Sequence, residues 1–92
     1  MAQTTAEILA ERQKTHGEFY KHAAISQELK HVLAKYDQGR LSYDQAEALG
    51  MIVHKIARIL NGNPNHKDHW DDIAGYATLV SIRLEKDKEP VK

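Results

Sequence analysis

The stretch SYDQAEALGMIVHKIARIL, residues 42–60, decides the fold because it has the pattern of one amphipathic helix. Ser42 followed three residues later by Gln45 is a capping-box pattern, which predicts a helix N-terminus. Apolar side chains then recur about every 100°, the period of an α-helix, and they comprise Leu49, Ile52, Val53, Ile56, Ile59 and Leu60. The segment NGNPN that follows gathers Asn, Gly and Pro, which end helices. We interpret the apolar side as core.

Helical patterns also flank this segment. Thr4 and Glu7 form a second capping-box pattern, so a helix should start there and kink or end at Gly17. The next helix is predicted over about residues 18–36, and its apolar side comprises Phe19, Ile25, Leu29, Val32, Leu33 and Tyr36. A last helix is predicted to begin within residues 65–68 and to run to about residue 85. The charged tail, residues 85–92, should fray.

Composition sets limits on the fold class and on the partners. Ninety-two residues are too few for two independent cores, so residues 1–92 should form one domain. No stretch alternates with a period of two, so strands are not expected. We predict an all-α fold of three to four helices in an antiparallel helical bundle. Thirteen Lys and Arg balance thirteen Asp and Glu, which leaves no broad positive field for nucleic acid.

The same composition bears on compartment. The chain has no cysteine, so disulfides and thiolate metal sites are excluded. Nowhere do about 18 apolar residues run together, and the N-terminus lacks the pattern of a signal peptide. We therefore expect a cytoplasmic protein with no membrane partner.

The last predicted helix is apolar on two sides. One side comprises Ile73, Ala77, Val80 and Leu84, flanked by Trp70 and Tyr76. Gly75, Leu79 and Ile82 form a second strip on nearly the opposite side. A helix that is apolar on two sides is usually buried between two neighbours, and in so short a chain one neighbour should be another subunit. We predict a homo-oligomer, a dimer or higher, with a close helix approach or a ligand contact at Gly75.

The start of that helix, HKDHWDD at residues 66–72, is strongly acidic, and two interpretations stay open. Asp68, Asp71 and Asp72 oppose the positive end of the helix dipole, an effect of about 0.3–1 kcal/mol each. Alternatively, Asp68 and Asp72 lie one turn apart and are suited to Mg²⁺, which takes one or two protein carboxylates plus substrate phosphates. Glu47 on the preceding helix could add a third ligand. The spacing of His66 and His69 is weak evidence for zinc.

A polar line opposite the predicted core side also has two interpretations. Glu47, Met51, His54 and Arg58 lie along it, with Lys55 beside them. They form either a solvated face or an anion clamp, because Lys55 and Arg58 one turn apart can reach the same phosphate chain. The short turn before the last helix brings these basic groups close to Asp68 and Asp72. The convergence suits a magnesium-bound nucleotide and suits an interhelical salt bridge equally well.

Several of these segments together resemble a known family. They are ILAERQKTHGEFYKHAAISQELKHVL at residues 8–33, HKIARILNG at residues 54–62 and DIAGYA at residues 72–77. The chain resembles a family of small phage and prophage proteins of unknown function. That family is in turn loosely similar to the MazG-type all-α nucleotide pyrophosphohydrolases.

The resemblance implies an oligomeric helical protein that holds Mg²⁺ on a nucleoside triphosphate. It assigns the catalytic and Mg²⁺-binding carboxylates to Glu47, Asp68 and Asp72. Beside them we predict that His54, Lys55, Arg58 and Tyr76 bind substrate, with Lys55 and Arg58 neutralising the phosphates. The family's Glu-x-x-Asp pattern departs here, because Gly50 stands where that pattern has aspartate, so one carboxylate is missing. Pyrophosphohydrolase activity thus stays open beside nucleotide binding. The alternative is a non-enzymatic phage interaction protein that modulates a host factor, with its charged residues forming interhelical salt bridges.

Overall fold

The computed structural model describes residues 2–88, and all regular structure in that range is helical. The four helices are α1 (Thr5–His16), α2 (Phe19–Asp37), α3 (Tyr43–Asn61) and α4 (Lys67–Asp87). The predicted all-α class is confirmed. Helix α4 extends two residues beyond the predicted end near residue 85, and residues 89–92 of the tail that was expected to fray lie outside the described residues. Within the described range, no helix combines the length and the hydropathy needed to cross a bilayer.

Both predicted capping boxes are present and set the starts of two helices. The Glu7 N–H donates to Thr4 Oγ1 over 3.1 Å, and the Glu7 carboxylate accepts from the Thr4 N–H in return. At the start of α3, the Ser42 N–H donates to Gln45 Oε1 over 2.9 Å. Helix α1 ends at Gly17, which has a φ of 78°. Gly17 therefore ends the helix and does not merely kink it.

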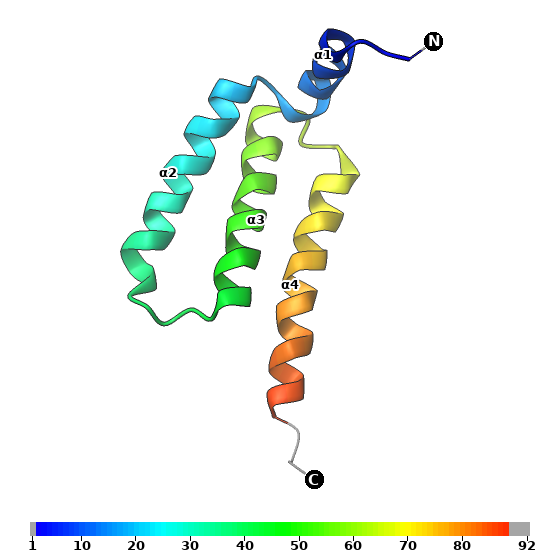
Figure 1. The fold of residues 1–92 in the computed structure, drawn as a ribbon. Coiled ribbons are helices and arrows are strands. Elements are labelled where there is room, and N and C mark those ends of the chain that lie inside the picture. The colour runs from blue at the N-terminus through cyan, green and yellow to red at the C-terminus, as the bar shows by residue number, and fades with distance from the viewer. Residues whose placement is uncertain (1, 89–92) are drawn as a thin grey trace.

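Helices α2, α3 and α4 lie side by side as antiparallel neighbours with α3 in the middle (Figure 1). Helix α3 contacts both neighbours, whereas α2 and α4 do not contact each other in the described part of the chain. Two consecutive residues show how α3 reaches both sides. His54 Nε2 lies 2.9 Å from Lys30 Nζ of α2, and Lys55 Nζ lies 2.9 Å from Asp72 Oδ2 of α4. The three helices therefore form one layer.

Helix α1 lies across one end of this layer and contacts α2 and α3 (Figure 1). Its last turn meets the turn between α3 and α4, where the Asn63 N–H donates to the Thr15 carbonyl over 3.0 Å. Asn61 Nδ2 donates to the Glu18 carbonyl over 2.7 Å. A Cβ on Gly62 would overlap the Thr15 carbonyl, and a Cβ on Gly17 would overlap Asn61. Glycine at both positions thus allows the two turns to pack backbone to backbone.

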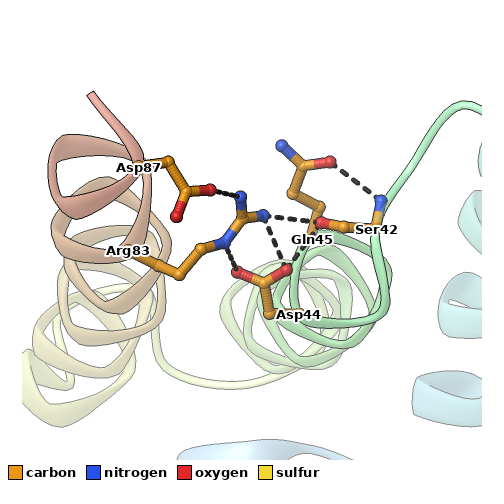
Figure 2. Close-up of polar contacts among 5 residues, drawn as sticks. All are labelled: Ser42, Asp44, Gln45, Arg83 and Asp87. Atoms are coloured by element: carbon orange, nitrogen blue, oxygen red, sulfur yellow. Dashed lines mark hydrogen bonds and ion pairs between the residues drawn. The ribbon is translucent and has the colours of Figure 1, made fainter. Parts of the chain in front are cut away.

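At the opposite end of the layer, Arg83 ties α4 to the start of α3 (Figure 2). Its Nε and one terminal nitrogen donate to the two Asp44 carboxylate oxygens over 2.9 and 2.8 Å, which is a bidentate pair. The Arg83 guanidinium also donates to Ser42 Oγ and to Asp87. These hydrogen bonds hold the pKa of Asp44 well below its usual range and raise the pKa of Arg83. The register of α3 against α4 is thereby fixed.

The layer buries few apolar side chains. Among the described residues, the buried hydrophobic ones are Ala48, Val53 and Ala57, all on α3. The rest of the predicted core side of α3 is only half-buried, and Leu60 is exposed. The reason is geometric, because the two neighbours of α3 cover its flanks and no element of the described chain covers this side.

Candidate functional site

The centre of the candidate site is an ion pair between α3 and α4. Lys55 Nζ lies 2.9 Å from Asp72 Oδ2, with 11% of the lysine side chain and 47% of the aspartate side chain exposed. The hydrogen bond from Lys55 lowers the pKa of Asp72, so this carboxylate is ionised at neutral pH. The pair is the interhelical salt bridge that the sequence left open as one interpretation.

Two further predicted residues share this face of the layer. Arg58 is half-buried one helical turn from Lys55. Burial, followed by the charge of Arg12, lowers the pKa of Arg58, and the negative charge of Asp72 opposes that shift. Tyr76 lines the same hollow as Asp72. The structure therefore brings Lys55, Arg58, Asp72 and Tyr76 together.

The predicted carboxylate Glu47 lies elsewhere along the layer. It lines a hollow of about 210 Å³ together with Tyr76, Leu79 and Val80. Position 80 of α4 is twelve residues from Asp68, which is roughly 18 Å along a helix axis. Asp68 itself is exposed and lies 3.8 Å from His66 Nε2. One chain therefore does not bring Glu47 and Asp68 together.

The aspartates in the first turns of α4 take part in separate ion pairs. Asp71 pairs with Lys67 one turn earlier, Asp72 pairs with Lys55, and Asp68 faces His66. Residues 2–88 contain no group of three or more His, Asp or Glu side chains placed to hold a metal ion. This arrangement corresponds to the interpretation of these charged residues as salt bridges, and the Mg²⁺ site stays a prediction.

Gly75 opens onto a shallow hollow of about 370 Å³ that is lined by Asp71, Asp72, Gly75, Tyr76 and Leu79. A Cβ added at Gly75 would meet no atom within 4 Å. The close approach predicted at Gly75 is therefore not made by residues 2–88, and within that range the position is open to another molecule.

His54, predicted to contact substrate, turns toward α2. Its Nε2 accepts from Lys30 Nζ, and its ring centroid lies 5.5 Å from that of His22. Burial, followed by the charge of Lys30, lowers the pKa of His54. The residue is thus neutral at pH 7 and stands apart from Asp72, although it lies next to Lys55 in sequence.

The chain can be assigned to a protein family. A family model for a domain of unknown function, DUF6378, matches residues 1–83. The chain belongs to the DUF6378 family. The match spans α1, α2, α3 and most of α4, so it includes the Lys55–Asp72 pair. No curated protein and no solved structure matches the chain. Membership in a family of unknown function is confirmed, whereas phage origin and likeness to MazG-type enzymes stay predictions.

This DUF6378 chain also contains histidines whose packing role the sequence did not reveal. His69 is almost fully buried, and its Nε2 donates to the Thr15 carbonyl over 3.1 Å. The His16 ring meets His69 edge-on at 4.9 Å. Burial, followed by the charges of Arg58 and His69, lowers the pKa of His16 to about 4. These histidines join α1 to α4, and they pack ring against ring.

Proposed function

We propose that this chain is a homo-oligomeric interaction protein whose function depends on self-association. The charged residues between α3 and α4 then serve as structural ion pairs. The observation that carries the proposal is the single helical layer, which leaves one side of α3 uncovered. An amphipathic helix gains most of its stability from packing its apolar face. A second copy of the chain is the occupant that supplies this packing.

The uncovered side is a continuous apolar surface. Two hollows of about 340 and 310 Å³ lie along it and share Leu41 and Leu49. We call this surface the apolar face, and its apolar lining residues are Val32, Leu33, Tyr36, Leu41, Ala48, Leu49, Ile52, Ala77 and Val80. Asp37, Arg40 and Gln45 also line the two hollows. Val32 is 54% exposed and Tyr36 62%. A contiguous apolar patch across three helices is typical of an interaction surface.

The accessible area supports a partner of the size of a second copy. The chain exposes 7252 Å², whereas a compact monomer of this length should expose about 5,400 Å². The excess is roughly 1,800 Å² by the same scaling. Permanent dimers bury about 1,000–2,500 Å² on each chain. Pairing the apolar faces of two copies would therefore bury, on each chain, an accessible area of about the size of this excess.

Light scattering of the full chain at micromolar concentration tests the assembly. We expect a mass at least twice that of one chain, and we expect Val32→Glu to shift the mass toward that of a single chain. Ala34→Glu is the matched control, because it adds the same charge at another exposed position two residues along α2. A wild-type monomer, or the same mass shift for both variants, would contradict the proposal.

A second candidate function is magnesium-dependent nucleotide binding, with a MazG-like pyrophosphohydrolase of phage origin as its enzymatic form. It is favoured by the gathering of Lys55, Arg58 and Tyr76 around Asp72, beside the hollow at Gly75. Mg²⁺ needs only one or two protein carboxylates when substrate phosphates complete its shell. Asp72 and Asp68, one turn apart, would be those carboxylates, without Glu47.

Thermal melting separates the two functions. If a nucleotide binds with Mg²⁺, the two together raise the melting midpoint by several degrees through mass action. Asp72→Asn then abolishes the rise. If Asp72 serves only in an ion pair, Asp72→Asn lowers the midpoint without any ligand, and neither Mg²⁺ nor nucleoside triphosphate changes the wild-type midpoint.

A further inference from the structure

A basic pocket lies where α1, α2 and α3 meet. It encloses about 320 Å³ and is lined by Leu9, Arg12, His16, Phe19, His22 and Arg58. Four of these six side chains carry basic nitrogens, and none carries a carboxylate. Arg58 places the pocket on the opposite side of α3 from the apolar face, because it stands about half a turn around the helix from Leu49. The pocket would stay open when two apolar faces pair.

The two arginines of the pocket lack acidic partners. Neither the Arg12 nor the Arg58 guanidinium takes part in an ion pair within residues 2–88. They lie close enough for the charge of Arg12 to lower the pKa of Arg58. The carboxylate that counteracts this effect, that of Asp72, is bound to Lys55. Two neighbouring cations, one of them half-buried, create a field that favours an anion.

His22 is a buried residue in the lining of the pocket. Its side chain is only 8% exposed, and its Nδ1 has no hydrogen-bond partner. Buried polar atoms are normally paired, but this nitrogen has less than 1 Å² of accessible surface, so a ligand in the pocket does not reach it. The groups that a ligand in this pocket can contact are therefore the two arginines and the exposed Leu9 and Phe19 side chains.

The remaining wall of the pocket is apolar and aromatic. Phe19 is 78% exposed, and its ring stacks on His22 with centroids 6.3 Å apart and planes inclined by 28°. Leu9 is also exposed. An exposed aromatic ring beside a cationic pocket suits a ligand that carries an anionic group on a planar or apolar body.

We propose that this pocket binds a small phosphate monoester, with its phosphate between Arg12 and Arg58 and its organic group against Leu9 and Phe19. Two guanidiniums offer ten N–H donors in planar forks, which match the three terminal oxygens of a phosphate dianion better than the two oxygens of a carboxylate. The zero net charge of the chain favours a small ligand over a nucleic acid. This site is independent of the assembly proposed above.

Isothermal titration calorimetry with inorganic phosphate, phenyl phosphate and benzoate tests the site. Wild type should bind phenyl phosphate most tightly and benzoate most weakly. Arg12→Met should weaken phenyl phosphate binding about ten-fold or more, because charge-assisted hydrogen bonds are lost. Arg40→Met is the matched control, since it removes one exposed guanidinium outside the pocket and should leave binding unchanged. The absence of wild-type binding at millimolar ligand, or an equal loss in Arg40→Met, would overturn the proposal.

Two measurements guard against a purely structural role. Arg12 is exposed and repels Arg58, so Arg12→Met should keep or raise the melting midpoint of the ligand-free chain. A lowered midpoint would assign Arg12 to the fold and overturn the proposal. Phe19→Ala should reduce the advantage of phenyl phosphate over inorganic phosphate and leave inorganic phosphate binding unchanged. If Phe19→Ala still prefers phenyl phosphate over inorganic phosphate as strongly as the wild type, Phe19 does not contact the ligand and the proposed ligand class is overturned.

Discussion

At the junction of the two turns, the missing side chain of Gly62 is what the packing requires. A Cβ at this position would overlap the Thr15 carbonyl and the His16 backbone. We predict that Gly62→Ala destabilises the fold by about 1–3 kcal/mol, because both backbones must shift. Gly50→Ala is the control, since Gly50 lies inside α3 with no atom within 4 Å of an added Cβ. It should stabilise by about 0.5–1 kcal/mol, and urea denaturation that gives both variants the same sign would contradict the prediction.

His16 makes stability depend on pH. Burial, followed by the charges of Arg58, His69, Arg12 and His66, lowers its pKa from 6.5 to about 4. Between these two values the unfolded chain binds a proton that the folded chain does not, so the free energy of unfolding falls as pH falls through this window. We predict a melting midpoint that drops between pH 7 and pH 4, and a smaller drop in His16→Asn. An unchanged pH profile in that variant would show that His16 does not titrate in this way.

At the scale of elements, the join between α3 and α4 rests on a buried lysine. Lys55 is almost fully enclosed, and Asp72 is its carboxylate partner. Removing Asp72 leaves a buried charge unpaired, whereas replacing Lys55 with an apolar side chain of similar size removes that charge. We predict that Asp72→Asn lowers the melting midpoint by several degrees, that Lys55→Met lowers it less, and that adding Lys55→Met to Asp72→Asn restores part of the loss. Strictly additive effects of the two substitutions would mean that the pair is not coupled.

The helices themselves could be predicted from local signals, but the sides of each helix that its neighbours cover could not. Thr4 and Ser42 mark helix starts through contacts within a few residues, and such contacts are visible as sequence spacing. The apolar periodicity of α3 identifies a side that needs cover. It does not say which element covers that side. The open layer, in which α2 and α4 stay apart, follows from interhelical contacts such as Arg83 with Asp44, which are 39 residues apart.

The candidate site, too, could be predicted from the sequence only in part. The approach of Lys55 and Arg58 to Asp72 was predictable, because a short turn makes α3 and α4 antiparallel neighbours. The position of Glu47 was not, because it depends on the register that Arg83 fixes about four turns along α4 from Asp68. The basic pocket was missed for a related reason. No local sequence pattern indicates that the helices carrying Arg12 and Arg58 pack together. The packing of Gly17 against the neighbouring turn brings the two residues into one pocket.

At the scale of the whole molecule, stability should depend on protein concentration. The buried hydrophobic residues among those described are Ala48, Val53 and Ala57, which form a small core for a chain that exposes 7252 Å². If a second copy covers the apolar face, association stabilises the folded chain by mass action. We therefore predict that the wild-type melting midpoint rises as protein concentration is raised a hundred-fold, as followed by circular dichroism. Val32→Glu should melt at a lower midpoint with little concentration dependence, while Ala34→Glu keeps the wild-type behaviour. A midpoint independent of concentration in the wild type would mean that the layer is stable alone, and the apolar face would then need a different occupant.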